Sequence, residues 1–362
     1  MKIEFPGIIL RDRLYSIEDL QIHCERLIKR NIPEWERNIF TFILDFLSDK
    51  DYVEQESSGT TGEKKTYKLT KKAMIESAKL TTAFFNLKFG QKALLCLPID
   101  YIAGKMMIVR ALVAGLNLFW EEPSSMPELS NYGKICFCAM VPFQVYNSFS
   151  NYEFFKNIDN LIIGGSEMRN ELFAMFRDIN NKTYETYGMT ETCSHIALRR
   201  ISGNDPEKYF TTLPGVSVEA DDRNCLIINA PFLDSPVKTN DVVEIVNNNQ
   251  FTWKGRFDNL INSGGIKTNP EELEMLISEV IDLEFAVIGI PDEKLGQKIV
   301  LVVESDRKHN ESEIINLISE VVEKEQVPKE IIYLEKLPRS SSYKIDRRRV
   351  FEIISLKKEG EN

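Results

Sequence analysis

The middle of the chain alternates short apolar runs with amphipathic segments, and this alternation constrains the fold more than any other feature. The runs KALLCLPI, KICFCAMVP and NLIIGG have the length and composition of buried strands, each closed by a turn signal. The segments GKMMIVRALVAG and EMRNELFAMFRDI carry apolar residues at helical spacing. Because strands that alternate with helices form a largely parallel sheet covered by helices, we expect an α/β fold with mostly parallel sheets.

Beyond this region the pattern changes to short strands separated by turns. GVSVEADDRNCLIINAP and DVVEIVNNNQFTWKGR predict a small antiparallel, barrel-like segment appended to the α/β part.

A second unit begins near GRFDNLINSGG. NPEELEMLISEV predicts a helix with Asn269 as its N-cap, Pro270 in its first turn and Glu272 completing a capping box. A strand FAVIGIP, a helix ESEIINLISEVVEK and a strand EIIYLEKLP follow, enough for a small α+β domain. We therefore expect a large N-terminal domain, 1–257, and a small, mobile C-terminal domain, 258–362, with a hinge near Asp258.

Composition excludes several classes of protein. The chain has 362 residues, of which 43% are hydrophobic and 28% charged, as in ordinary globular proteins. A formal net charge of -10 argues against nucleic-acid binding, and no apolar run is long enough for membrane insertion. The six cysteines form no CxxC pair or zinc-binding spacing, and residues 1–30 lack the apolar core of a signal peptide. We expect a cytoplasmic protein with free thiols, for which a homo-oligomer is compatible with the sequence.

The stretch SSGTTGEKK combines glycines, hydroxyl groups and lysines, the three ingredients of an anion-binding turn. It does not fit the NTPase pattern GxxxxGK followed by Ser or Thr, because Gly59 and Gly62 are only three positions apart, and it does not fit GxGxxG. By itself the stretch is compatible with a flexible polar loop or with a phosphate-binding loop.

The surrounding motifs favour phosphate binding. SSGTTGEKK resembles the phosphate-binding loop, S/T-SGTTGxPK, of the adenylate-forming superfamily, which includes the acyl-CoA synthetases. Other stretches are similar to further superfamily motifs in the same order: TYETYGMTET at 183–192, KTNDVVEI at 238–245, WKGRFDNLINSGGIKTNPEELE at 253–274, IGIPDEKLGQ and LPRSSSYKIDRRRV. The resemblance spans residues 54–350.

The sequence departs from the superfamily pattern in places. Tyr343 replaces the glycine before the final lysine, Asn240 replaces the glycine of the TGD motif, and Lys64 replaces the proline before the loop lysine. Only 56 residues precede the phosphate loop, so we expect a shortened N-terminal domain.

The resemblance implies a ligase with two half-reactions. A carboxylate attacks the α-phosphate of ATP, which releases pyrophosphate and leaves an acyl-adenylate; the thiol of CoA then attacks this intermediate and releases AMP. A carboxylate is already nucleophilic, so the protein must mainly neutralise phosphate charge and align the reactants. The implied ligands are ATP, CoA, Mg²⁺ and a small-molecule carboxylate.

The motif positions imply roles for single residues. Thr190 is expected at the α-phosphate, and Glu191 is expected to bind Mg²⁺, which prefers carboxylate and phosphate oxygens. Tyr187 matches the aromatic residue that stacks on adenine, Asp241 the acceptor for the ribose hydroxyls, and Arg256 the arginine that reaches ribose or phosphate. The residues expected to hold the β,γ-phosphates are Ser58, Gly59, Thr60, Thr61, Gly62 and Lys65.

Other positions bear on the acyl-adenylate and on CoA. Gly164 and Gly165 would leave room for the acyl-adenylate and adenine at a strand end, and a tight turn at the same place is compatible with this role. Lys344 is the expected catalytic lysine, used for adenylate formation only. The small domain would then rotate about Asp258 and replace Lys344 with the loop that contains Gly264 and Gly265, which would line the path of CoA.

Within the superfamily, TNDVVEI, YGMTETCSHIALR and LPIDYIAGKMMIVRAL are most similar to the o-succinylbenzoate–CoA ligases of menaquinone biosynthesis, although Tyr101 stands where a histidine is common. Three alternatives remain: a ligase for another aryl or fatty acid, an adenylation enzyme that serves a carrier protein, and a nucleotide-binding protein without turnover. o-Succinylbenzoate has two carboxylates, and the candidate anchors for the second are Lys105, Arg110, Ser194 and His195.

Overall fold

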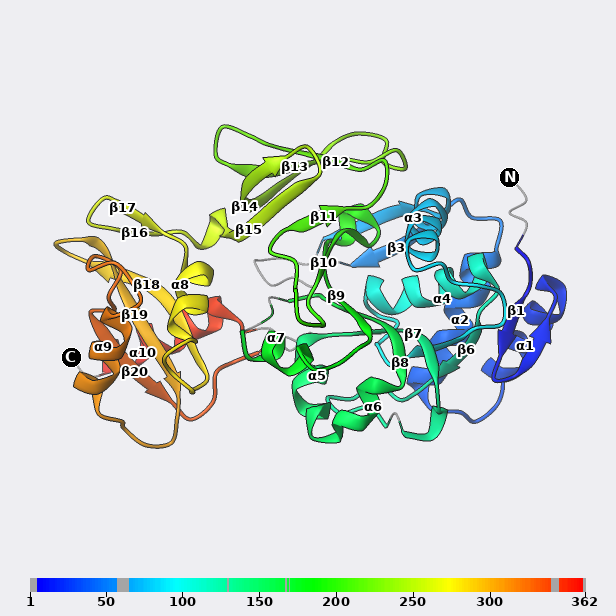
Figure 1. The fold of residues 1–362 in the computed structure, drawn as a ribbon, viewed down its shortest axis with the longest axis horizontal. Helices are drawn as coiled ribbons and strands as arrows, with labels where there is room; N and C mark the ends of the chain where they lie inside the picture. The colour runs from blue at the N-terminus through cyan, green and yellow to red at the C-terminus, as the bar shows by residue number, and fades with distance from the viewer. Residues whose placement is uncertain are drawn as a thin grey trace.

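The computed structural model describes residues 5–56, 65–128, 130–166, 168, 170–339 and 345–360. Figure 1 shows a larger body, which runs from β1 to β15, and a smaller lobe, which runs from β16 to α10.

The body is built on one long sheet. Within the described residues it has thirteen strands, of which β1, β6, β5, β7, β8 and β9 are parallel neighbours and the others pair antiparallel. The strands, in spatial order, are β12 (Ser217–Ala220), β13 (Cys225–Asn229), β14 (Val237–Asn247), β15 (Gln250–Arg256), β11 (Phe210–Thr212), β10 (His195–Arg200), β9 (Lys182–Gly188), β8 (Ile158–Ile163), β7 (Ile135–Met140), β5 (Lys92–Leu95), β6 (Asn117–Trp120), β1 (Ile8–Leu10) and β2 (Arg13–Tyr15). The predicted α/β fold with an appended antiparallel segment is confirmed.

Helices cover both faces of the central parallel strands, which explains the apolar runs in β5, β7 and β8. Ala93 and Leu95 of β5 face one core cluster, whereas Leu94 faces another. The first cluster is covered by α1 (Ile17–Ile28), α2 (Glu34–Leu47), α3 (Lys71–Phe84) and α4 (Ile102–Ala114). The second is covered by α5 (Pro142–Ser148), α6 (Tyr152–Lys156) and α7 (Asn170–Phe176). None of the helices in the described residues is long and apolar enough to cross a membrane.

A separate hairpin, β3 (Tyr52–Glu56) and β4 (Thr66–Thr70), flanks the stretch SSGTTGEKK. Gln55 Nε2 donates a hydrogen bond to the backbone oxygen of Asp100 at 2.8 Å and ties β3 to the start of α4. Thr70 then caps α3, because its Oγ1 accepts from the backbone N–H of Ala73 at 3.1 Å. The hairpin is therefore tied to α4 near its connecting stretch and to α3 at its outer end.

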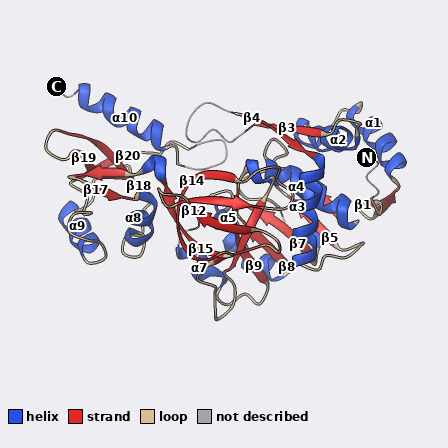
Figure 2. Ribbon diagram, turned by 90° about the horizontal axis from the view of Figure 1, so that it is seen from above, coloured by secondary structure: helices blue, strands red, loops and turns tan. Residues whose placement is uncertain are grey.

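The smaller lobe has its own sheet. The strands are β17 (Ile266–Thr268), β16 (Ile261–Ser263), β19 (Gly296–Glu304), β18 (Phe285–Asp292) and, paired with β19, β20 (Glu330–Leu334). Helices α8 (Pro270–Ile277) and α9 (Glu311–Ser319) cover one face, and α10 (Arg347–Gly360) covers the other (Figure 2). The lobe thus encloses two apolar clusters of its own.

The predicted capping box at the start of α8 is wrong. Asn269 occupies the N-cap position, but its side chain makes no cap hydrogen bond, and its Oδ1 is buried without a partner. Glu272 instead forms an ion pair with Lys254 of β15, with Nζ and Oε1 3.0 Å apart. Glu272 therefore pairs with the Lys254 ammonium on β15, and the predicted capping hydrogen bonds do not form.

Candidate functional site

Three residues expected to bind the nucleotide lie together at the junction of β9, β14 and β15. The Tyr187 hydroxyl donates a hydrogen bond to Asp241 Oδ2 at 2.7 Å. Asp241 is opposite Arg256 in the β14–β15 ladder, and Arg256 Nη1 lies 3.4 Å from Asp241 Oδ1. Burial, together with the Asp241 charge, raises the pKa of Tyr187 well above its usual value, so the phenol stays a neutral donor. The arrangement presents an aromatic ring, a carboxylate and a guanidinium side by side.

The pair Gly164–Gly165 follows β8 at the carboxyl edge of the parallel strands. A Cβ on Gly164 would lie 1.9 Å from Thr186 Oγ1, so the neighbouring strand β9 requires a glycine here. Gly165 has φ +90°, a conformation that L-residues with side chains rarely adopt. Gly165 is therefore favoured by its backbone conformation and Gly164 by its contact with the Thr186 side chain, whatever ligand lies beside them.

Glu191 and Thr190 lie in a short turn, Thr190–Thr192, directly after β9. Thr192 fixes this turn, since its Oγ1 accepts from the Met189 N–H at 3.1 Å and lies 2.7 Å from the Ser194 carbonyl oxygen. Strand β4 packs against the turn, and its Tyr67 donates a side-chain hydrogen bond to Glu191. Burial and this bond raise the pKa of Tyr67 to about 12. Sequence reasoning missed Tyr67, which no motif singles out.

The chemistry of this turn suits Mg²⁺. Glu191 is a half-buried carboxylate next to a hydroxyl-bearing turn, and magnesium is usually bound through one or two carboxylates together with substrate phosphates. The described residues contain no cluster of three or more His, Cys, Asp or Glu side chains that could hold a metal ion. The remaining ligands would therefore be phosphate and water oxygens.

Behind the turn lies a buried cationic cluster. Arg110 of α4 is 1% exposed, and its Nη2 donates to Ser194 Oγ at 2.5 Å and to His195 Nδ1 at 3.4 Å. His195 Nε2 lies 3.1 Å from Oγ1 of Thr81 on α3. Among the described side chains, no carboxylate forms an ion pair with Arg110, and its Nε is buried without a hydrogen-bond partner.

This environment changes both titratable groups. Burial lowers the pKa of Arg110 from 12.5 to about 9. Burial and the Arg110 charge lower the pKa of His195 well below 6.5, so His195 is neutral. Three of the four candidate anchors thus converge. Lys105 does not join them, because its Nζ donates to the backbone oxygen of Glu54 at 3.2 Å.

Side-chain contacts surround Asp258, where we expect the domain boundary. Asp258 accepts hydrogen bonds from Asn240 Nδ2 at 3.1 and 3.2 Å and from Arg256 Nη2 at 2.9 Å. Asn240, which departs from the superfamily pattern, thereby gains a contact that glycine could not make.

The expected CoA-side loop lies between β16 and β17, where Gly264 and Gly265 have φ +62° and +86°. In Figure 1 this hairpin is on the outer part of the smaller lobe, well separated from β9 and β10. Arg347 is held internally, since its Nη1 and Nη2 bind the two Glu274 oxygens at 2.6 and 2.7 Å. Among the residues predicted for the site, Ser58, Gly59, Thr60, Thr61, Gly62 and Lys344 lie outside the described residues.

Known proteins match this chain. A family model described as AMP-binding enzyme matches residues 55–224. The solved structure of an acyl-CoA synthetase (AMP-forming)/AMP-acid ligase II-like protein from Dyadobacter fermentans is 32% identical, with a TM-score of 0.60. That match covers 92% of this chain and 97% of the other. The chain therefore belongs to the family of AMP-binding, adenylate-forming enzymes, as the motifs predict.

Two further matches concern one branch of this family. The 2-succinylbenzoate–CoA ligase of Listeria monocytogenes is 26% identical over 324 residues, which are 82% of this chain and 68% of that relative. The o-succinylbenzoate CoA synthetase from Bacillus subtilis, solved in complex with its acyl-adenylate intermediate, shares the fold at 20% identity and a TM-score of 0.72. That match covers 82% of this chain and 68% of the other. The roles of single site residues and the domain boundary stay predictions.

Proposed function

We propose that this protein is an ATP-dependent, AMP-forming acid–CoA ligase whose acid is o-succinylbenzoate. The observation that carries the choice of acid is the buried guanidinium of Arg110, which has no carboxylate partner among the described residues. A buried charge without a counter-ion is costly, so it favours a site that an anionic ligand completes. o-Succinylbenzoate has one carboxylate to activate and a second one for Arg110. The similarity to 2-succinylbenzoate–CoA ligases supports the same acid.

In the first half-reaction, a carboxylate oxygen attacks the α-phosphorus of ATP and the bond to pyrophosphate breaks. Asp241 and Arg256 hold the ribose and Tyr187 packs on adenine, which fixes the α-phosphate for in-line attack. The Thr190 hydroxyl and the Lys344 ammonium stabilise the charge that develops on the phosphate oxygens. Glu191 would hold Mg²⁺, which supplies further charge neutralisation to the phosphates when bound. The β,γ-phosphates are held by Ser58, Gly59, Thr60, Thr61, Gly62 and Lys65.

In the second half-reaction, the CoA thiol attacks the carbonyl carbon of the mixed anhydride and AMP leaves. We place the two functional units at 1–257 and 258–362, with the smaller unit rotating about Asp258 between the half-reactions. Rotation would carry Lys344 away and bring Gly264 and Gly265 to the acyl-adenylate. In support, the Lys254–Glu272 pair across the boundary has side chains 31% and 41% exposed, and such pairs contribute only about 0–1 kcal/mol.

The test is a CoA-thioester assay with o-succinylbenzoate, benzoate and long-chain fatty acids, run beside a pyrophosphate-release assay. We expect both products with o-succinylbenzoate and little thioester with the other acids. Preference for a monocarboxylate would contradict the proposed acid. Pyrophosphate release without thioester would favour a carrier-protein adenylation enzyme, and ATP binding without pyrophosphate release would favour a protein without turnover. We further propose a cytoplasmic location, which suits six free cysteines.

A further inference from the structure

Arg110 is held from behind by a chain of buried polar groups. Thr81 is 0% and His195 5% exposed, and the two come from α3 and β10. The contacts run from Arg110 Nη2 to His195 Nδ1 at 3.4 Å, from His195 Nε2 to Thr81 Oγ1 at 3.1 Å, and from Thr81 Oγ1 to the Ser77 carbonyl oxygen at 3.3 Å. Consecutive hydrogen bonds thus join Arg110, His195, Thr81 and Ser77 inside the body.

The direction of each of these hydrogen bonds follows from the two groups at the ends of the series, the Arg110 guanidinium and the Ser77 carbonyl. A guanidinium can only donate, so His195 Nδ1 must accept, and a neutral imidazole then carries its proton on Nε2. The Nε2–H donates to Thr81 Oγ1, whose own hydrogen points to the Ser77 carbonyl, which can only accept. Ser194 Oγ, 3.4 Å from His195 Nδ1, fits the same assignment because it can donate to that nitrogen. His195 is thereby fixed in one neutral tautomer.

The position of Ser194 in the sequence also limits how far the Arg110 contact can lie from Glu191. Ser194, which contacts Arg110, follows Glu191 by three residues, so the Cα atoms of these two residues lie at most about 11 Å apart. The guanidinium is fixed at Nη2 by Ser194 and His195, whereas its Nε has no hydrogen-bond partner. A buried donor without a partner, on a guanidinium that is otherwise fixed, would be satisfied by the second carboxylate of a short dicarboxylic acid.

We propose that Thr81 and His195 are positioning residues that hold the Arg110 guanidinium toward the distal carboxylate and so set the preference for dicarboxylic over monocarboxylic acids. This inference rests on the proposed function. The tautomer is part of it: a cation at His195 would repel Arg110, and an Nδ1–H tautomer would offer Arg110 no acceptor.

Two substitutions of His195 separate its contact with Arg110 from its contact with Thr81. In His195→Asn the amide oxygen takes the place of Nδ1 and keeps the acceptor for Arg110, whereas in His195→Gln the amide takes the place of Nε2 and keeps only the link to Thr81. Thr81→Val removes the hydroxyl at constant shape. The readout is KM for o-succinylbenzoate divided by KM for benzoylpropionate, which lacks the ring carboxylate, with KM for MgATP measured alongside.

We expect His195→Gln to raise KM for o-succinylbenzoate about ten- to a hundred-fold, because one charge-assisted hydrogen bond is lost, and His195→Asn to raise it only a few-fold. Thr81→Val should fall between them. KM for benzoylpropionate and for MgATP should stay unchanged, as should all constants in the control His23→Gln. Equal effects of His195→Gln on the two acids would overturn the inference.

Nitrogen NMR of the imidazoles gives a second, independent readout. The chain has only three histidines, so His195→Asn assigns the signal directly. We expect a neutral Nε2–H tautomer at pH 7, and an Nδ1–H or a charged imidazole would refute the proposed direction of the chain. Arg110→Met distinguishes the anchoring role of Arg110 from the positioning role of His195 and Thr81. If it leaves the ratio of KM values unchanged, the proposed anchor fails; if it collapses the ratio while His195→Gln and Thr81→Val do not, only the positioning role fails.

Discussion

Replacing Arg110 with methionine should make the unliganded protein more stable, although it removes several hydrogen bonds. The fall of the Arg110 pKa from 12.5 to about 9 corresponds to roughly 5 kcal/mol of unfavourable free energy for holding the charge at pH 7. Arg110→Met removes this cost and keeps most of the side-chain volume. It also leaves Ser194 and His195 without their donor, which costs about 2 kcal/mol. The net expectation is a rise of roughly 2–3 kcal/mol in the free energy of unfolding.

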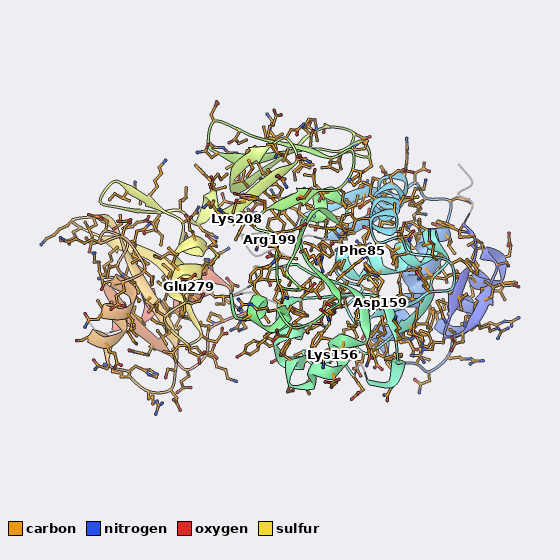
Figure 3. The ribbon with its side chains drawn as sticks, viewed as in Figure 1. Phe85, Lys156, Asp159, Arg199, Lys208 and Glu279 are labelled. Atoms are coloured by element: carbon orange, nitrogen blue, oxygen red, sulfur yellow. The ribbon has the colours of Figure 1, made fainter. Side chains whose placement is uncertain are left out.

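Urea unfolding followed by circular dichroism measures this difference, and Arg199→Met is its matched control. Arg199, labelled in Figure 3, forms an ion pair with Glu185, whose side chain is 7% exposed. Loss of Arg199 leaves a buried, unpaired carboxylate and should lower the free energy of unfolding by about 3 kcal/mol. The same substitution therefore has opposite signs at the two sites. An Arg110→Met protein that is no more stable than wild type would show that the buried charge of Arg110 does not destabilise the unliganded fold.

The remaining predictions concern single steps of the reaction and of binding. Lys344→Ala should reduce pyrophosphate release about 10²–10³-fold yet keep thioester formation from supplied acyl-adenylate; equal loss of both would contradict the division of labour. Tyr67→Phe should raise the Mg²⁺ concentration needed for ATP binding, measured by calorimetry, about tenfold, because Glu191 loses its orienting donor, whereas Tyr52→Phe on the same hairpin should not. Because the pKa of Arg110 is lowered to about 9, affinity for o-succinylbenzoate should fall as pH rises through that value, and a flat profile to pH 10 would argue against a charged anchor. The stability difference between Arg110→Met and wild type should likewise be constant below about pH 9 and shrink above it, where the native arginine loses its proton before the unfolded one does.

The parts of the fold that depend on local pattern could be predicted from the sequence. β5, β7 and β8 are apolar because both faces of the parallel sheet are covered, and this produces the uninterrupted runs that reveal them. Tyr187, Asp241 and Arg256 could be predicted as nucleotide-binding residues because each belongs to a motif, and the structure places the three side chains together.

The parts that depend on tertiary contacts could not be predicted. Thr81 comes 29 residues before Arg110 and 114 before His195, and nothing in its helix distinguishes it from an ordinary core threonine. Tyr67 reaches Glu191 only because β4 packs against the turn after β9. The expected cap at Asn269 failed for the same reason, since Lys254 from another strand engages Glu272.

Gly188 lies where the nucleotide motif and the cationic cluster touch. It is opposite His195 in the β9–β10 ladder, and a Cβ there would lie 2.4 Å from both His195 Cα and the Ser194 carbonyl oxygen. The paired backbones of β9 and β10 at Gly188 and His195 therefore form a wall shared by the proposed nucleotide and acid sites. Evolution toward another acid would have to proceed by exchanging side chains such as Arg110 and His195, since any displacement of this wall would disturb ATP binding as well.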